Sequence, residues 1–384
     1  MIQKLSVLII VLGIGFTTFA QDTYLDAKTE DKEKTFVGGE TYKVKTFTQN
    51  FKSEKPKNII FLIGDGMGVS QVFSGLTANK GRLFLDNCKY IGFSKTQSAD
   101  NYITDSAAGG TALSAGVRTN NGAIGVDANN IPVKTILEDA EENGLATGLV
   151  STSTITHATP ASFIAHQPKR SMYEEIALDF LKTDIDVFIG GGKAHFTNRK
   201  DGRNLVEELK EKGYQFEENL NKISKVKQGK LAALTADGDA GRMEQRGDML
   251  PVSTKTAINI LSKNEKGFFL MVEGSQIDWG GHASSTVYIV EDMLDFDKSI
   301  GKALEFAAKD GETLVLVTAD HETGGMAITG GSFEDGTVKA GYPTTGHTAV
   351  MVPIFAYGPG AEEFIGIMDN TDVHAKMKKL LLGN

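Results

Sequence analysis

Cysteine is nearly absent from this sequence, since Cys88 is the single one among 384 residues. One cysteine cannot form a disulfide within the chain, so the fold must be stable through packing, with or without bound metal. The glycine-rich phosphate loop GxxxxGK[ST] is also missing, which excludes a nucleotide site of that kind. We expect Cys88 to be a core residue.

Long blocks of one charge sign are absent as well. The exception is a short cluster, Lys376, Lys378 and Lys379, which we interpret as a solvated helix face. The formal net charge is -9. A nucleic-acid-binding protein needs a basic surface to neutralise phosphates, so the composition argues against a nucleic-acid partner. An apolar content of 40% and a charged content of 23% are typical of a soluble globular protein.

The N-terminus has the layout of a secretory signal peptide, residues 1–20. Lys4 precedes an uncharged run over 5–16, and small residues precede Gln21. A buried first strand or a membrane anchor are the alternatives, but the run is short for a membrane span. No cysteine lies near Ala20 to carry a lipid. We therefore expect an exported protein, periplasmic or secreted, without a stable membrane anchor.

Residues 21–55 are polar, and we expect them to form a loose N-terminal arm. Pro56 then opens a single domain over 56–384, in which apolar runs alternate with helical patterns. This alternation predicts an α/β fold with a mostly parallel sheet flanked by helices. Residues 213–250 are interpreted as a surface excursion, and residues 326–346 as a loop. Strands are expected at 58–63, 146–150, 187–189, 267–272, 313–318 and 350–357, and helices at 172–181, 205–212, 252–261 and 289–308.

Acidic and imidazole side chains follow three of the predicted strands. Asp65 follows the strand 58–63, Glu273 follows 267–272, and Asp320 with His321 follows 313–318. In open α/β sheets, sites form at the carboxyl ends of the strands. A single such aspartate is usually a turn residue, but three together predict a metal site at one edge of the sheet.

Asp278 and His282 are four residues apart, which places both side chains on one face of a helical turn. A carboxylate and an imidazole suit zinc, and an incomplete ligand set leaves room for substrate or water. A lone pair of this kind is more often a surface contact. His347 stands alone in a loop, where a structural or exposed histidine is the usual interpretation.

Ser106 is the candidate nucleophile because only small residues follow it, which permits close packing at a helix start. A helix N-terminus offers N–H donors and a positive dipole end to an anion. An ordinary capping serine has the same features. The hydroxyl becomes a strong nucleophile only where its pKa is lowered, as a bound metal does.

Three more residues fit a phosphate and metal site. Thr159 offers a hydroxyl oxygen of the kind found in octahedral magnesium sites, and His157 lies two residues before it. Arg170 could bind two phosphate oxygens with its fork of donors. Taken alone, Arg170 is more typical of a surface residue.

Together these segments resemble the alkaline phosphatase family, and most closely its compact bacterial members, including cold-adapted ones. Six motifs occur in family order between residues 65 and 357: Asp-Gly-Met-Gly, Thr-Asp-Ser-Ala, His-Ala-Thr-Pro-Ala, Val-Glu-Gly-Ser-Gln-Ile-Asp, Thr-Ala-Asp-His-Glu and Gly-His-Thr. The resemblance implies a three-layer sandwich around a mostly parallel sheet. It also implies two Zn²⁺ ions and one Mg²⁺ ion.

The resemblance implies a role for each matching residue. Ser106 is similar to the nucleophile that becomes phosphoserine, and Arg170 to the residue that clamps phosphate. The implied metal ligands are Asp278, His282 and His347 for the first zinc, Asp65, Asp320 and His321 for the second, and Asp65, Thr159 and Glu273 for magnesium. Two such zinc ions would stabilise the entering and leaving oxygens of an in-line displacement.

The sequence departs from the family pattern at two site positions. Trp279 stands where some members carry a charged or imidazole side chain, so it would shape the entrance or simply pack. His157 stands where others carry aspartate, which leaves the third metal open between zinc and magnesium. The disulfides of some exported members are missing, and residues 326–346 are too few for the large crown of animal members.

The resemblance implies hydrolysis of small phosphate monoesters, with a possible homodimer as the assembly. A phosphodiesterase of the same superfamily is the alternative, although such enzymes usually lack a clamp like Arg170. A sulfatase would need a CxPxR-like context, which is missing around Ser106. A non-catalytic phosphate-binding module is disfavoured because every expected ligand is present.

Overall fold

The computed structural model describes residues 31–48 and 50–383, so the predicted signal peptide lies outside the described residues. Ten strands form the main sheet. In order across the sheet they are β15 (Gly366–Asp369), β3 (Tyr90–Lys95), β14 (Val352–Tyr357), β9 (Thr313–Thr318), β2 (Asn58–Gly64), β8 (Phe268–Gly274), β4 (Ala146–Thr154), β5 (Val187–Gly191), β7 (Leu231–Leu234) and β6 (Gln215–Glu217). Within this sheet of the described chain, β14 alone runs antiparallel to its neighbours.

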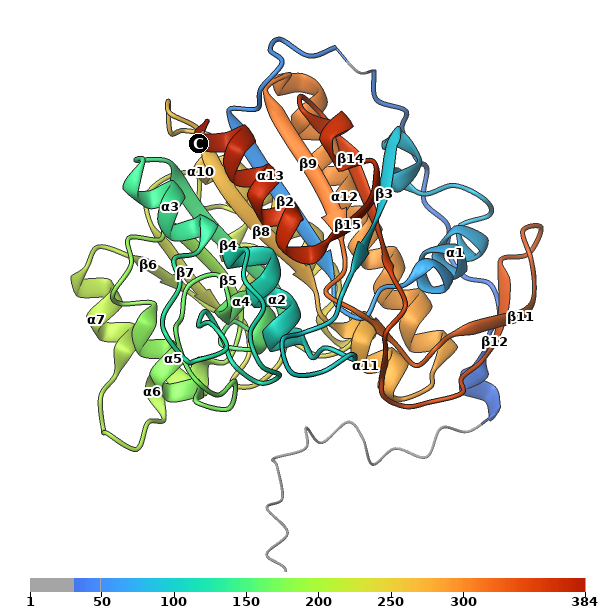
Figure 1. Ribbon diagram of the computed structural model, residues 1–384, viewed down its shortest axis with the longest axis horizontal. Coiled ribbons are helices and arrows are strands. Elements are labelled where there is room, and N and C mark those ends of the chain that lie inside the picture. Colours follow the sequence, from blue (N-terminus) through green and yellow to red (C-terminus); the bar gives the residue numbers. More distant parts are fainter. Residues whose placement is uncertain (1–30, 49, 384) are drawn as a thin grey trace, which may run out of the picture.

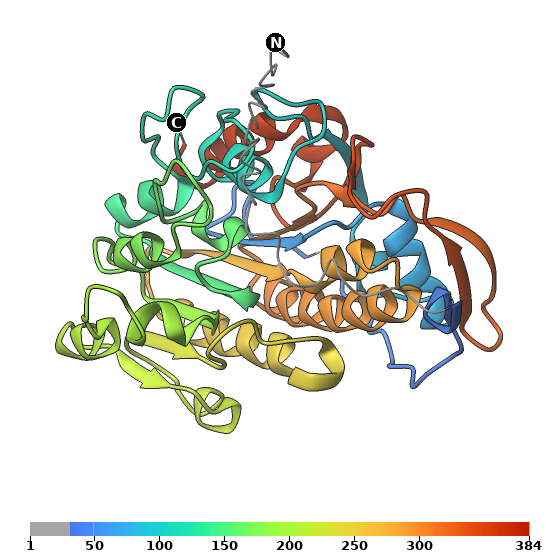
Figure 2. The same ribbon diagram turned by 90° about the horizontal axis from the view of Figure 1, so that it is seen from below.

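Helices cover both faces of this sheet. The long α12 (Thr286–Asp310) and α10 (Met249–Leu261) pack on one face, and α13 (Asn370–Leu382) and α2 (Ser106–Ala115) lie on the other. Figure 2 shows the strands between the two helical layers. The predicted α/β fold, a mostly parallel sheet between helices, is therefore confirmed.

The remaining helices are shorter. They are α1 (Val69–Ala78), α3 (Ile136–Glu142), α4 (Ala158–Ala161), α5 (Tyr173–Asp179), α6 (Lys193–Thr197), α7 (Leu205–Glu211), α8 (Leu220–Ile223), α9 (Met243–Arg246) and α11 (Gln276–His282), with 3₁₀ turns η2 (Asp31–Lys34), η3 (Phe84–Asn87) and η4 (Ala361–Phe364). None of the helices in the described ranges has the length and apolar character needed to cross a bilayer.

Two small sheets stand apart from the main one. The first joins β1 (Thr35–Phe36), β12 (Thr337–Gly341) and β11 (Ala327–Ser332), and it lies beside α1 (Figure 1). The second pairs β10 (Glu322–Thr323) with β13 (His347–Thr348). The predicted loop at 326–346 is thus largely a β-hairpin. Because β1 belongs to the first sheet, the segment before the domain pairs with this hairpin.

The prediction of a surface excursion over 213–250 is wrong. This segment contributes β6 and β7 to the main sheet and contains α8 and α9. The four residues of β7 are fully buried against β5. A four-residue apolar run is too short to produce a clear period of two, which explains why the pattern did not reveal a strand.

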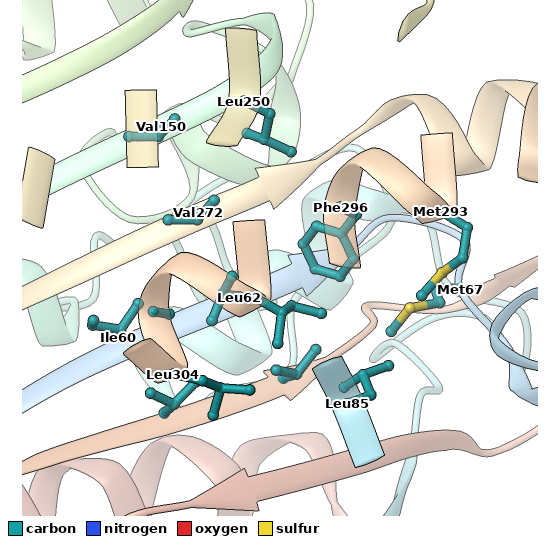
Figure 3. Packing of buried hydrophobic residues seen from close by; sticks show 14 of the residues in the cluster. Ile60, Leu62, Met67, Leu85, Val150, Leu250, Val272, Met293, Phe296 and Leu304 are labelled. Carbon is teal, nitrogen blue, oxygen red and sulfur yellow. The ribbon is translucent and has the colours of Figure 1, made fainter. Parts of the chain in front are cut away.

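The core consists of two clusters separated by the sheet. Along β2, Ile60 and Leu62 face the α12 side, whereas Ile59, Phe61 and Ile63 face the other. Alternation of this kind follows from the strand geometry, and burial on both faces explains the unbroken apolar run. Figure 3 shows Ile60 and Leu62 packed with Leu304 and Phe296 of α12. These contacts fix the carboxyl end of β2, where the candidate site lies.

Candidate active site and metal centre

The central strands bring the predicted strand-end residues together. β2 lies between β9 and β8 and runs parallel to both, with Ile63 opposite Thr318 and Glu273. Asp65 comes directly after β2, and Asp320 and His321 follow β9 after one intervening residue. Each of the three places one ligand atom within 4.8 Å of the others. His321 Nε2 lies 3.4 Å from Asp65 Oδ1 and 3.3 Å from Asp320 Oδ2. The predicted convergence at this edge of the sheet is therefore present.

A second cluster forms beside it from Asp278, His282 and His347. Asp278 and His282 lie one turn apart on α11, and His282 Nε2 is 3.3 Å from Asp278 Oδ2. His347 arrives from β13, opposite Thr323 of β10, and its Nε2 lies 3.5 Å from Asp278 Oδ1. The His347 ring stacks on that of His321 with centroids 3.6 Å apart, so the two clusters are adjacent.

Hydrogen bonds to backbone carbonyls orient two of these imidazoles. His282 Nδ1 lies 2.5 Å from the Thr345 carbonyl oxygen, and His347 Nδ1 lies 2.8 Å from that of Thr104. A carbonyl can only accept, so each Nδ1 must carry the proton. In the neutral rings each Nε2 then keeps its lone pair, facing Asp278 and the Nε2 of the other ring 3.2 Å away. This arrangement is typical of histidines that bind a metal.

A third group comprises Asp65, His157 and Glu273. Thr159 follows His157 in α4, a short helix that packs on β8, and its side chain is fully buried. Several buried oxygens in this region make no hydrogen bond within the described chain: both carboxylate oxygens of Asp65, Oδ2 of Asp320, Oε1 of Glu273 and Oγ1 of Thr159. Buried oxygens of this kind are costly without a partner, so the donor set fits bound cations.

Ser106 is the first residue of α2 and is 2% exposed. Asp105, not Ser106, caps the helix, since its Oδ1 accepts from the Ala108 amide at 3.0 Å. The Ser106 hydroxyl instead lies 3.3 Å from His321 Nε2. The ordinary capping interpretation of this serine is therefore wrong, and its hydroxyl points at the cluster of Asp65, Asp320 and His321.

Small residues after Ser106 allow α2 to approach the metal ligands. A Cβ on Gly109 would lie 3.1 Å from both Cβ and the carbonyl oxygen of Asp320. On Gly110 it would lie 2.5 Å from the hydroxyl of Ser162. Larger side chains would push the helix and Ser106 away from Asp320. This close approach is the reason for the small residues seen in the sequence.

Arg170 lies beside the nucleophile rather than on an isolated surface. Its Nη1 donates to Asp105 Oδ2 at 3.1 Å, and its Nη2 lies 3.2 Å from His157 Nε2. The side chain is 25% exposed. Its position next to the helix start at Ser106 is suited to a phosphate that enters from solvent.

Negative charge is concentrated in this pocket. Burial raises the pKa of Asp65, and the neighbouring Asp320, Asp278 and Glu273 raise it further. Burial, followed by Asp278 and Glu273, raises the pKa of Asp320 to about 8. Burial alone would also raise the pKa of Asp278, but the adjacent His282 holds it well below its usual value. Carboxylates crowded in this way are stabilised by divalent cations.

The indole of Trp279 lies on α11 and is 8% exposed, with its ring 6.0 Å from that of His157 in an edge contact. Trp279 therefore packs beside the third group. This contact describes packing against His157 and does not test whether Trp279 touches a substrate, so its role at the entrance stays a prediction.

Sequence reasoning missed three residues that organise the site. Thr323 contacts both Asp278 and His321, and Asp105 binds Arg170 while it caps α2. Glu322 is a buried carboxylate next to the ligands. Its oxygens accept from Gln71, from the amides of residues 325 and 326, and from Thr348. Glu322 is thus saturated by hydrogen bonds, and it fixes β10 against β13. Two of these residues could have been found from the sequence, because Asp105 directly precedes Ser106 and Glu322 directly follows His321.

Comparisons with known proteins agree with this geometry. The alkaline phosphatase family model matches residues 56–338. Alkaline phosphatase 4 of Bacillus subtilis is 37% identical, over 82% of this chain and 87% of its own length. The solved alkaline phosphatase of the Antarctic bacterium TAB5 is 43% identical with a TM-score of 0.81, covering 85% of this chain and 98% of that one. A variant of that enzyme, with one histidine replaced by aspartate and Mg bound in its M3 site, superposes with a TM-score of 0.80 at the same identity and coverage.

Proposed function

Because the chain belongs to the alkaline phosphatase family and is a metal-dependent phosphomonoester hydrolase, we propose that it works through a phosphoserine intermediate on Ser106. The observation that carries this proposal is the contact of 3.3 Å between Ser106 Oγ and His321 Nε2. It directs a buried hydroxyl, free of any capping role, into a cluster of candidate metal ligands.

We assign the ions by the chemistry of the donors. Asp278, His282 and His347 would hold one zinc, and Asp65, Asp320 and His321 the second, since mixed carboxylate and imidazole sets suit zinc. Asp65, Thr159 and Glu273 offer oxygen atoms, which suit magnesium.

His157 adds an imidazole to the third group, which favours zinc there more than an all-oxygen set would. A TAB5 variant with aspartate in place of one histidine carries Mg in its M3 site. We assign one magnesium to this group, with His157 as the residue that makes zinc a competitor.

The bound ions would supply positive charge that lowers the pKa of the serine hydroxyl and neutralises charge on the transferring phosphoryl group. The chain's own residues do the rest. The Ser106 oxygen forms a bond to phosphorus while the bond to the alcohol oxygen breaks. Water then cleaves the bond between the serine oxygen and phosphorus, which releases inorganic phosphate and restores the hydroxyl. Arg170, held by Asp105, binds phosphate oxygens through both steps.

The test compares Ser106→Ala with Ser114→Ala, a matched control in the same helix. Ser114 is buried, and its hydroxyl donates to the Ser162 carbonyl at 2.6 Å. Each protein is incubated with labelled phosphomonoester in zinc and magnesium and quenched in acid. Label should remain on the wild type and on Ser114→Ala, and not on Ser106→Ala. Label on Ser106→Ala would place the nucleophile elsewhere.

Comparing the turnover of phosphate monoesters and diesters by the same preparation tests the alternative that the protein is a phosphodiesterase. Arg170, beside the helix start, provides hydrogen-bond donors for unesterified phosphate oxygens. A phosphate diester has one fewer of these oxygens than a monoester. We therefore propose a preference for small monoesters. Turnover of diesters faster by orders of magnitude would contradict it.

We also propose that residues 1–20 direct export to the periplasm or the medium and that the chain has no stable membrane anchor. The net charge of -9 supports the absence of a nucleic-acid partner. The family resemblance supports a homodimer as a possible assembly. N-terminal sequencing of the protein from its own host, which should begin near Gln21, and sedimentation analysis would test these points.

A further inference from the structure

Thr323 lies between the two candidate zinc clusters, although it belongs to neither set of ligands. It is the second residue of β10, two positions after His321, and it is fully buried. Its hydroxyl donates to Asp278 Oδ1 and lies 3.2 Å from His321 Nδ1. One side chain therefore contacts a ligand of each cluster.

The proton count of these three groups permits one arrangement. A threonine hydroxyl has a single hydrogen, and an ionised carboxylate can only accept. The hydrogen of Thr323 is therefore used by Asp278, so the hydroxyl oxygen must accept from the imidazole. His321 Nδ1 then carries the proton, and a neutral ring is left with its lone pair on Nε2. That nitrogen is the one facing Asp65, Asp320 and the hydroxyl of Ser106.

We propose that Thr323 is a positioning residue that joins the two zinc sites, by fixing the tautomer of His321 and the rotamer of Asp278 with one hydroxyl. The inference rests on the proposed function, since it takes both clusters to be zinc sites. It adds a residue that the strand-end and spacing patterns do not point to.

The three imidazoles differ in how this proton is held. Backbone carbonyls hold it on His282 and His347, so no substitution at the accepting positions removes those acceptors. Within the described chain, His321 Nδ1 has the Thr323 side chain as its hydrogen-bond partner. The orientation of His321 is therefore the one that a single side-chain substitution can disturb.

Packing holds the Thr323 side chain in this rotamer. A Cβ on Gly66 would lie 2.8 Å from its Oγ1, and a Cβ on Gly281 would lie 2.8 Å from its Cγ2. The backbones of Gly66 and Gly281 therefore pack closely against the two sides of the Thr323 side chain. A hydroxyl confined in this way keeps its direction when an ion binds, which is what a positioning residue requires.

The experiment measures zinc affinity in full-length Thr323→Val, which keeps the shape and removes the hydroxyl, and in Thr323→Ser, which keeps the hydroxyl. Thr318→Val is the matched control, because Thr318 is a buried threonine of neighbouring β9 whose hydroxyl donates to the Pro353 carbonyl at 2.9 Å. Competition with a chromophoric chelator should show zinc affinity lowered about 10–100-fold in Thr323→Val. The affinity should fall at both zinc sites, because Thr323 contacts a ligand of each.

Thr323→Ser should recover most of that affinity, and Thr318→Val should bind zinc like the wild type. The inference is overturned if Thr323→Val also binds like the wild type, or if Thr318→Val loses as much. A wild type that binds no zinc would instead refute the proposed function, so the two failures are distinguishable.

A second measurement does not depend on whether the valine variant folds. Nitrogen-15 NMR of histidine-labelled, zinc-loaded wild type should show His321 with its proton on Nδ1 and zinc on Nε2. Zinc on Nδ1, or a proton on Nε2, would overturn the inference.

Discussion

Replacing Gly66 with alanine tests how closely the two ligand clusters are packed. Gly66 follows Asp65 with φ of +74°, in the left-handed region. An added Cβ would lie 2.7 Å from Asp278 Cα and 2.9 Å from Asp278 Cβ. Carbon atoms in contact are normally about 3.5–4.0 Å apart, so Asp65 and the start of α11 must separate by about 1 Å.

The expected cost has two parts. The left-handed backbone costs about 1–2 kcal/mol for a residue with a Cβ, and the overpacking adds about 1–3 kcal/mol. A shift of about 1 Å between the clusters should lower kcat/KM by about 10². Zinc affinity at Asp278 should fall as well, because its carboxylate moves relative to His347.

Gly213→Ala is the matched control. Gly213 has φ of +88°, and an added Cβ would meet nothing within 4 Å. This variant should lose about 1–2 kcal/mol of unfolding free energy from the backbone alone and keep its kcat/KM. Urea unfolding and hydrolysis of p-nitrophenyl phosphate would be measured for both. Equal activity of the two variants would refute the close packing described here.

Three further predictions concern the phosphate, the metals and a carboxylate outside the site. Arg170→Ala should raise KM for monoesters and weaken inhibition by inorganic phosphate at least tenfold; unchanged phosphate inhibition would show that Arg170 does not bind phosphate. Exhaustive chelation should abolish activity and zinc should restore it, whereas full activity in the chelated protein would refute the metal assignment. Burial raises the pKa of Asp297 to about 7, so the folded chain binds this proton more tightly than the unfolded chain. The contribution of Asp297 to stability is therefore greatest below about pH 4 and falls as pH rises toward 7. The difference in unfolding free energy between the wild type and Asp297→Asn should change across that window. A difference that does not depend on pH would contradict this prediction.

The parts of the site that sequence could predict are those that follow an uninterrupted apolar strand. Asp65, Glu273 and Asp320 are recognisable because each lies at or just beyond the end of such a run, and parallel strands end at one edge. The spacing of Asp278 and His282 likewise predicts one helical face. These features depend on local periodicity, which a sequence displays directly.

Other features depend on contacts between distant segments. Nothing in the apolar run of β14 indicates that it runs antiparallel to β9, since strand direction leaves no mark on composition. β7 was missed because four residues are too few to show a period. Thr323 was missed because a threonine in a short strand is ordinary, and its role arises only where β10, α11 and Gly66 meet.

Anomalous diffraction at the zinc edge, from crystals grown with zinc and magnesium, tests the central claim most directly. We predict one zinc peak among Asp278, His282 and His347, and another among Asp65, Asp320 and His321, with the Ser106 hydroxyl beside the second. Peaks confined to surface histidines, or a Ser106 side chain turned away from both clusters, would contradict the account.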